Sequence, residues 1–167
     1  MLQEHAKIVQ FISLAEEVTG RKKLQKMIYI AKKMDFPFSE KFELHMYGPY
    51  SEELTLRVEE LCEMGFLNEQ RIDKGSYVQY QYDVSGEGQR FLETAEKVPD
   101  SLSNFIQKMQ AKSSRFLELV STLLYFDHFE KKEQIEKVQV VKNKLKFSEA
   151  EIEDAFVFLN DLELISN

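Results

Sequence analysis

The chain has 167 residues and a mass of 19.7 kDa, the size of one domain or of one domain with a helical addition, so a multidomain enzyme is not expected. Hydrophobic residues make up 43% and charged residues 31%, with only 6 Gly and 3 Pro, which excludes a disordered linker and indicates a folded core. The formal net charge of −7 argues against nonspecific binding of nucleic acid.

Several classes of protein are excluded by what the chain lacks. Its apolar stretches are only a few residues long, and its first residues have neither the basic nor the apolar region of a signal peptide. We therefore expect a cytoplasmic protein that does not enter a membrane. Cys62 is the single cysteine, which excludes an intramolecular disulfide and a multi-cysteine zinc site.

The first part of the chain alternates helical and strand-like patterns. Ser51 is a candidate N-cap, Gly65 can adopt the left-handed conformation that ends a helix, and Gly48-Pro49 is typical of a turn. The predicted elements are, in chain order, a helix over 2–17, a helix over 21–34, a short strand over 42–47, a helix over 51–64, strands over 66–71 and 77–84 that form a hairpin, and a helix over 85–97.

The segment Val98-Pro99-Asp100 is the clearest joint in the chain, and we place a boundary there between residues 1–97 and 98–167. Beyond it the pattern is entirely helical. Ser148 with Glu151 three residues later forms a capping box for the last helix. The predicted fold class is α+β and mostly helical, with a winged-helix-like N-terminal domain and an all-helical C-terminal annex.

Motifs for catalysis or for metal and cofactor binding are missing. The three histidines, His5, His45 and His128, fall on different elements, with no His, Cys or paired acid at metal-ligand spacing. Cys62 is expected to be a core thiol, because it would act as a nucleophile only if the fold brought a partner to it. No phosphate-binding glycine loop occurs either. We therefore expect no metal, no cofactor and no enzymatic activity.

The segment from Arg21 to Met34 carries six cations and no acid. Three explanations stay open: a solvated helix face that pairs with acids elsewhere, a surface for an acidic protein partner, and a surface for DNA phosphates. The predicted helix over 51–64, which would be the recognition helix, has five acids against Arg57 alone, a net charge of −4 that DNA would repel. An acidic protein partner is therefore favoured over DNA.

Two tyrosines flank the predicted Gly48-Pro49 turn. Aromatic side chains give a large contact area with few rotors, so these tyrosines could anchor a partner, although the segment is also explained as a turn that leads into the next helix. The candidate binding residues are Lys22, Lys23, Lys26, Tyr29, Lys33, Tyr47 and Tyr50.

Short motifs resemble known families. The winged-helix signals are Leu61-Cys62-Glu63-Met64-Gly65-Phe66-Leu67, which resembles the exit from a recognition helix, and Tyr82-Asp83-Val84-Ser85-Gly86-Glu87-Gly88, which is similar to the run that leaves the wing of many bacterial regulators. A second pair is Lys23-Leu24-Gln25-Lys26-Met27-Ile28-Tyr29 and Tyr47-Gly48-Pro49-Tyr50-Ser51-Glu52-Glu53-Leu54, which looks like the Panacea (SocA-like antitoxin) group. The whole chain looks closer still to the uncharacterised YwgA-like family of bacilli.

These resemblances imply a protein-binding adaptor or antitoxin built on a winged-helix frame. The alternative is a winged-helix DNA-binding transcription regulator that uses the basic helix and the hairpin tip around Lys74. Neither motif extends beyond Val98, so the C-terminal helices could redirect the function. The sequence does not define the partner or the oligomeric state.

Overall fold

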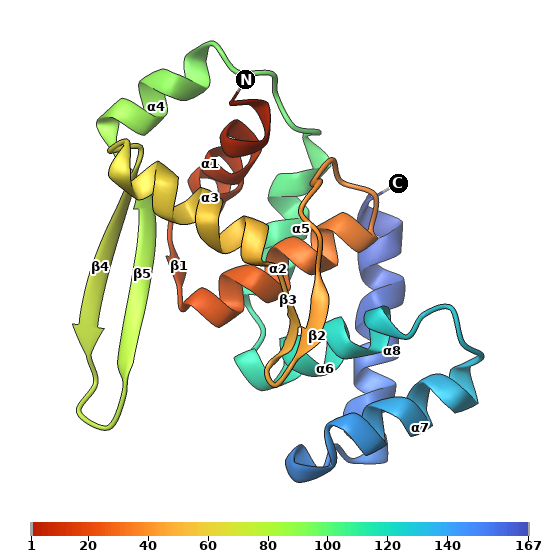
Figure 1. The fold of residues 1–167 in the computed structure, drawn as a ribbon. Helices are drawn as coiled ribbons and strands as arrows, with labels where there is room; N and C mark the ends of the chain where they lie inside the picture. The colour runs from red at the N-terminus through yellow and green to blue at the C-terminus, as the bar shows by residue number, and fades with distance from the viewer. Residues whose placement is uncertain (1, 167) are drawn as a thin grey trace.

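The computed structural model describes residues 2–166 and has an α+β architecture in which helices predominate (Figure 1). The elements are, in chain order, α1 (Gln3–Ala15), β1 (Val18–Thr19), α2 (Arg21–Lys33), β2 (Glu43–His45), β3 (Gly48–Tyr50), α3 (Glu52–Glu63), β4 (Leu67–Asp73), β5 (Val78–Val84), α4 (Gly86–Glu93), α5 (Ser101–Gln110), α6 (Ser114–Tyr125), α7 (Lys131–Val141), the short 3₁₀ helix η1 (Asn143–Leu145) and α8 (Glu149–Ser166). The α+β class and the wholly helical second part are as predicted.

The predicted helix ends are formed by the expected residues. The Ser51 side chain accepts a hydrogen bond from the backbone N–H of Leu54 at 3.1 Å, and Gly65 follows α3 with a φ of +78°. Ser148 and Glu151 exchange side-chain to backbone hydrogen bonds of 3.1 Å each, which is the predicted capping box. Local signals therefore fix where these helices begin and end.

The turn predicted at Gly48-Pro49 is wrong. These two residues belong to β3 and pair with His45 and Leu44 of β2 in an antiparallel hairpin, so the chain reverses one step earlier, at Met46 and Tyr47. Gly48 has a φ of +100°, a backbone conformation that residues with a side chain rarely adopt, whereas a Cβ there would lie at an ordinary contact distance of 3.5 Å from the hydroxyl of Ser121 on α6. The backbone conformation next to the turn, rather than close packing, therefore favours glycine at this position.

The second sheet has the strand order β1-β5-β4 and is antiparallel throughout. The two-residue strand β1, which the sequence did not indicate, pairs with β5 through Val18 and Tyr82. The β4–β5 hairpin extends well beyond β1 and projects from the helical body (Figure 1). Among residues 2–166, no further strand pairs with its far end.

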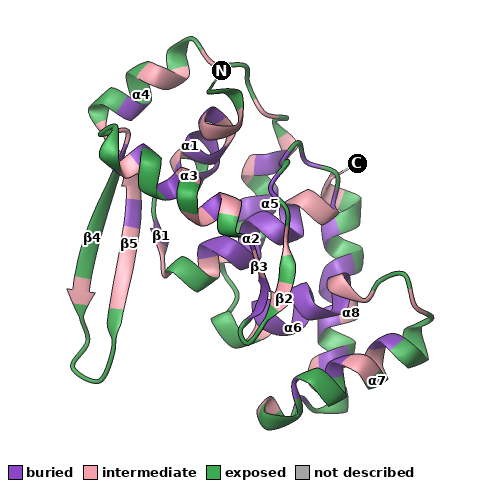
Figure 2. Ribbon diagram, viewed as in Figure 1, coloured by how far each residue is buried: buried purple, intermediate pink, exposed green. Residues whose placement is uncertain are grey.

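The core runs through both parts of the chain. Figure 2 shows buried residues concentrated on α1, α2, α5 and α6. Helix α2 packs on α6, α1 packs on α5, and α8 covers α5 and α6, so one hydrophobic cluster joins residues on both sides of the predicted boundary. The division into 1–97 and 98–167 stays a prediction.

Helix α3 buries one apolar stripe. Leu54, Val58 and Leu61 are at most 7% exposed, and each such side chain contributes about 1.5–3 kcal/mol when it leaves water. Phe66, which follows the helix, is only half-buried and stacks on Phe91 of α4 with ring centroids 4.5 Å apart.

Candidate functional site

A groove of about 440 Å³ opens between the N-terminal half of α2, the helix α3, the β2–β3 hairpin and the strands β4 and β5. Figure 1 shows how the elements that line it are arranged: the β4–β5 and β2–β3 hairpins stand on either side, with α3 above and the start of α2 between them. Its floor is apolar, because Leu24, Leu54 and Val58 line it with almost wholly buried side chains. Its volume is within the range of about 300–1,000 Å³ that ligand pockets occupy. We refer to this site as the groove.

The amide of Gln25 fixes one wall of the groove. Its oxygen accepts the backbone N–H of Ser51 at 2.8 Å, and its nitrogen donates to the Ser51 carbonyl at 3.0 Å and to Thr55 Oγ1 at 3.1 Å. The hydroxyls of Tyr50 and Thr55 lie 2.9 Å apart, which extends the network to the hairpin. A buried amide satisfied on both sides holds α2, α3 and β3 in one geometry.

The rim of the groove on the hairpin side is aromatic and exposed. Met46 is 80% exposed and Tyr47 is 53% exposed at the tip of the hairpin. Lys22 Nζ lies 3.2 Å from the ring centroid of Tyr47, and His45 stacks on Tyr50 with centroids 4.8 Å apart. When large apolar side chains are this exposed and gather at a groove, they mark a surface that binds other molecules.

The opposite end of the groove is ionic. Arg21 Nε donates to the hydroxyl of Tyr82 at 3.0 Å, its Nη2 lies 3.3 Å from Glu69 Oε2, and its guanidinium stacks 3.6 Å above the ring of Tyr80. The Tyr82 hydroxyl donates to the same Glu69 oxygen at 2.6 Å. Burial, followed by the hydrogen bond to Glu69, raises the pKa of Tyr82, so this phenol stays protonated and donates.

The cations of α2 do not form one exposed face. Lys23 donates to the carbonyl of the last residue of α5 at 3.3 Å, Lys33 pairs with Asp127 after α6 at 2.9 Å, and Lys32 donates to a carbonyl in the loop before β2. Lys26 is only 4% exposed. The expectation of a basic surface is therefore wrong for Lys26, because α6 packs across that side of α2.

Lys26 belongs to a buried charged cluster beneath the hairpin tip. We call Lys26, Glu118 of α6 and Lys142 after α7 the buried lysine cluster. Lys142 Nζ donates to the Met46 carbonyl at 2.6 Å and lies 3.9 Å from Glu118 Oε1, and both side chains are less than one-tenth exposed. Burial lowers the pKa of both lysines, against the opposing effect of Glu118. The C-terminal helices thus hold the rim of the groove.

Of the predicted binding residues, Lys22, Tyr47 and Tyr50 come together at the groove. Tyr29 is 5% exposed, packs edge-on against Phe42 at 5.0 Å and has a pKa raised by burial, so it is unavailable to a partner. Lys23, Lys26 and Lys33 bind or face other elements of the same chain, as described above. The structure therefore places part of the predicted set at one site and the rest in the contacts between helices.

Several functional candidates were missed by the sequence analysis. Met46, Glu69 and Tyr82 line the groove, yet none was a predicted binding residue, and Tyr82 appeared only as part of the motif that resembles a wing. Leu54 and Val58 form the groove floor as well as part of the core, and an apolar residue gives no sequence signal for that second role. A polar residue inside an apolar helical stripe, such as Glu118 in α6, was the one available signal for the buried lysine cluster.

The side chains considered for catalysis or metal binding, His5, His45, His128 and Cys62, lie on different segments of the chain. Within residues 2–166 no group of three or more His, Cys, Asp or Glu side chains is placed to hold a metal ion. His5 Nε2 lies 3.3 Å from Glu60 Oε1, but neither residue lines the groove. Burial, with a smaller effect of Glu69, raises the pKa of Cys62 to about 11, so the thiol is protonated at neutral pH.

The fold and the site together define an α+β protein with an open groove that has an apolar floor and lies between two hairpins. No helix in the part of the chain that the structure describes is long and apolar enough to cross a membrane. No family model matches the chain. It is 51% identical over 165 residues to the Bacillus subtilis (strain 168) protein named "Uncharacterized protein YwgA", and the match covers 99% of each chain. The chain therefore belongs to the YwgA family, as its resemblance indicated.

Proposed function

We propose that this protein is a non-enzymatic protein-interaction module of adaptor or antitoxin type, and that its partner docks at the groove. The observation that carries the proposal is an open groove whose apolar floor continues into the exposed side chains of Met46 and Tyr47. A few aromatic and apolar anchors supply most of the binding energy in protein interfaces. The antitoxin or adaptor assignment also draws on the resemblance to the Panacea group.

A winged-helix frame is part of this proposal. The order α3, β4–β5 hairpin and α4 is that of a recognition helix followed by a wing. The groove lies beside α3 rather than on its outer surface, so a protein partner would use a different face of the frame from the one that enters a DNA groove.

The second candidate is a DNA-binding regulator, which the same element order favours. Three glutamates of α3 that do not line the groove are exposed, namely Glu52, Glu60 and Glu63, and these would face the DNA phosphates. A gel-shift titration with the protein's own promoter over increasing salt separates the candidates. Specific binding that weakens steeply with salt would support the regulator and contradict the adaptor.

Affinity capture from native cells with mass spectrometry tests the primary candidate. The bait is the full chain, compared with a groove variant, Met46→Glu with Tyr47→Glu, and a control variant, Val157→Glu with Leu164→Glu. Both pairs are exposed and apolar, and the control pair lies on α8. We expect a partner that the wild type and the control capture and the groove variant does not, and that rebinds when purified. Equal capture by all three would contradict docking at the groove.

A further inference from the structure

The two cations of the groove both contact other groups of the same chain. The Arg21 guanidinium pairs with Glu69 and also contacts two tyrosines of β5. The Lys22 ammonium lies over the Tyr47 ring at 3.2 Å, and within residues 2–166 it makes no hydrogen bond or ion pair, so it keeps its charge. An acidic partner would have to displace Glu69 from Arg21, which leaves Lys22 at the hairpin rim as the groove cation open to it.

Both carboxylates of the groove keep oxygen atoms that make no bond with residues 2–166. Glu59 is exposed on the groove wall, and its carboxylate makes no hydrogen bond or ion pair with the described residues. Glu69 uses Oε2 for its two bonds, while Oε1 makes none in this part of the chain. An incoming cation can therefore bind at Glu59 without displacing a contact of this chain.

The surroundings extend this negative field. Glu52 and Glu63 are also exposed on α3 without ion pairs among residues 2–166, and the chain carries a formal net charge of −7. Clustered charge of one sign attracts ligands of the other sign and accelerates their association. An apolar side chain of the partner would exclude water from the floor formed by Leu54 and Val58, which is favourable.

We propose that the groove binds a short segment of its partner in which a lysine or arginine adjoins an apolar side chain, the cation at Glu59 and the apolar group on the floor. This inference rests on the proposed function and names the chemistry of its partner. It differs from the acidic partner expected from the sequence, because that expectation depended on cations that the structure places in contacts with other parts of the chain.

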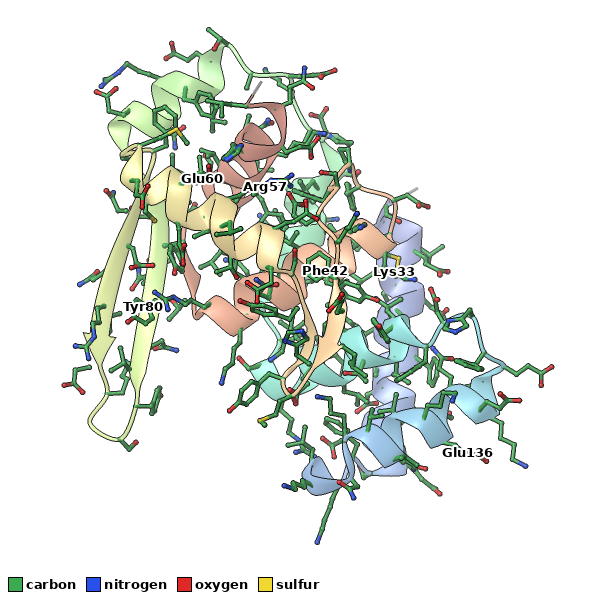
Figure 3. The ribbon with its side chains drawn as sticks, viewed as in Figure 1. Lys33, Phe42, Arg57, Glu60, Tyr80 and Glu136 are labelled. Carbon is green, nitrogen blue, oxygen red and sulfur yellow. The ribbon has the colours of Figure 1, made fainter. Side chains whose placement is uncertain are left out.

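Panning a random linear peptide library on the immobilised full chain tests the proposal. The most enriched peptide is then synthesised with a fluorophore, and its affinity is measured by anisotropy for the wild type, Glu59→Gln, Glu59→Lys and Glu136→Lys. Glu136 is an exposed glutamate on α7, far from the β4–β5 hairpin (Figure 3), so Glu136→Lys matches the change in net charge and leaves the groove intact.

We expect enriched peptides that combine basic and apolar residues. Glu59→Lys should weaken their binding by at least about tenfold, Glu59→Gln by less, and Glu136→Lys by no more than about twofold. Enrichment of acidic peptides would overturn the charge inference and leave the groove as the docking site. Equal losses for Glu59→Lys and Glu136→Lys, or no enrichment, would overturn the inference, while the capture experiment judges the proposed function separately.

Discussion

Replacing Lys26 or Lys142 with methionine removes the same charge from the buried lysine cluster, but we expect opposite effects on the free energy of unfolding. Lys142 pairs with Glu118, whereas the buried Lys26 makes no ion pair within residues 2–166, so the cluster has an excess positive charge. Lys26 makes no hydrogen bond with the described residues, whereas Lys142 donates to the Met46 carbonyl at 2.6 Å. The buried ammonium group of Lys142 is therefore stabilised by a hydrogen bond, whereas that of Lys26 is not.

The size of each effect follows from these contacts. A hydrogen bond from a charged donor contributes about 1.5–3 kcal/mol, so Lys142→Met should cost about 2 kcal/mol. For a chain of this length that lowers the melting temperature by about 4–8 °C. Lys26→Met leaves a neutral pair of Lys142 and Glu118 and removes an unpartnered buried charge, so stability should be unchanged or rise by up to about 1 kcal/mol.

Urea unfolding followed by circular dichroism measures both variants, with Lys132→Met as the control for losing one exposed lysine. Equal m-values would show that the variants are compared over the same transition. Burial lowers the pKa of Lys26 in the folded state, so the unfolded state binds more protons as the pH rises towards 10.5. Wild-type stability should therefore rise with pH in that window, and rise less in Lys26→Met. A Lys26→Met variant destabilised as much as Lys142→Met would refute this account.

Three further predictions concern other sites. Gly88→Ala should destabilise the fold by more than about 2 kcal/mol in urea unfolding, because its Cβ would lie 2.2 Å from a backbone oxygen, whereas Gly86→Ala, with open space around it, should stabilise by about 0.4–1 kcal/mol; equal effects would contradict the packing. Hydrogen bonds from an arginine and from a backbone N–H lower the pKa of Glu151 to about 2, so its stabilisation is present above pH 4.5 and is lost as the pH falls towards 2; the difference in melting temperature between wild type and Glu151→Gln should shrink over that range, and a constant difference would count against it. Tyr82→Phe should cost about 1–2 kcal/mol in urea unfolding through loss of its bond to Glu69, and a silent substitution would disprove that bond's contribution.

The parts of this fold that could be predicted from the sequence are those set by residues close together in the chain. Ser51, Gly65 and the Ser148–Glu151 pair act on their own helices, so their effects do not depend on distant packing. The burial of Lys26 is different, because it depends on α6 lying across α2, and helical spacing on α2 alone contains no information about its neighbour.

The candidate site shows the same limit. Lys22, Tyr47 and Tyr50 were predictable because their residue types are chemically distinctive and close to one motif. Glu69 and Tyr82 reach the groove only because β4 and β5 pair and β5 also pairs with β1. The site is assembled from two helices and two hairpins, and of the pairings it depends on, the β4–β5 hairpin was predicted whereas the pairing of β5 with β1 was not.

The bond from Lys142 to Met46 joins positions 96 residues apart in the chain. Because a residue from the helical part holds the rim of the groove, a change in that part would alter the position of the rim. If the groove is the docking site, substitutions in α6, α7 or the segment after α7 would change the affinity for a partner that makes no contact with them. Selection for partner binding would then act on the C-terminal helices as well as on the groove.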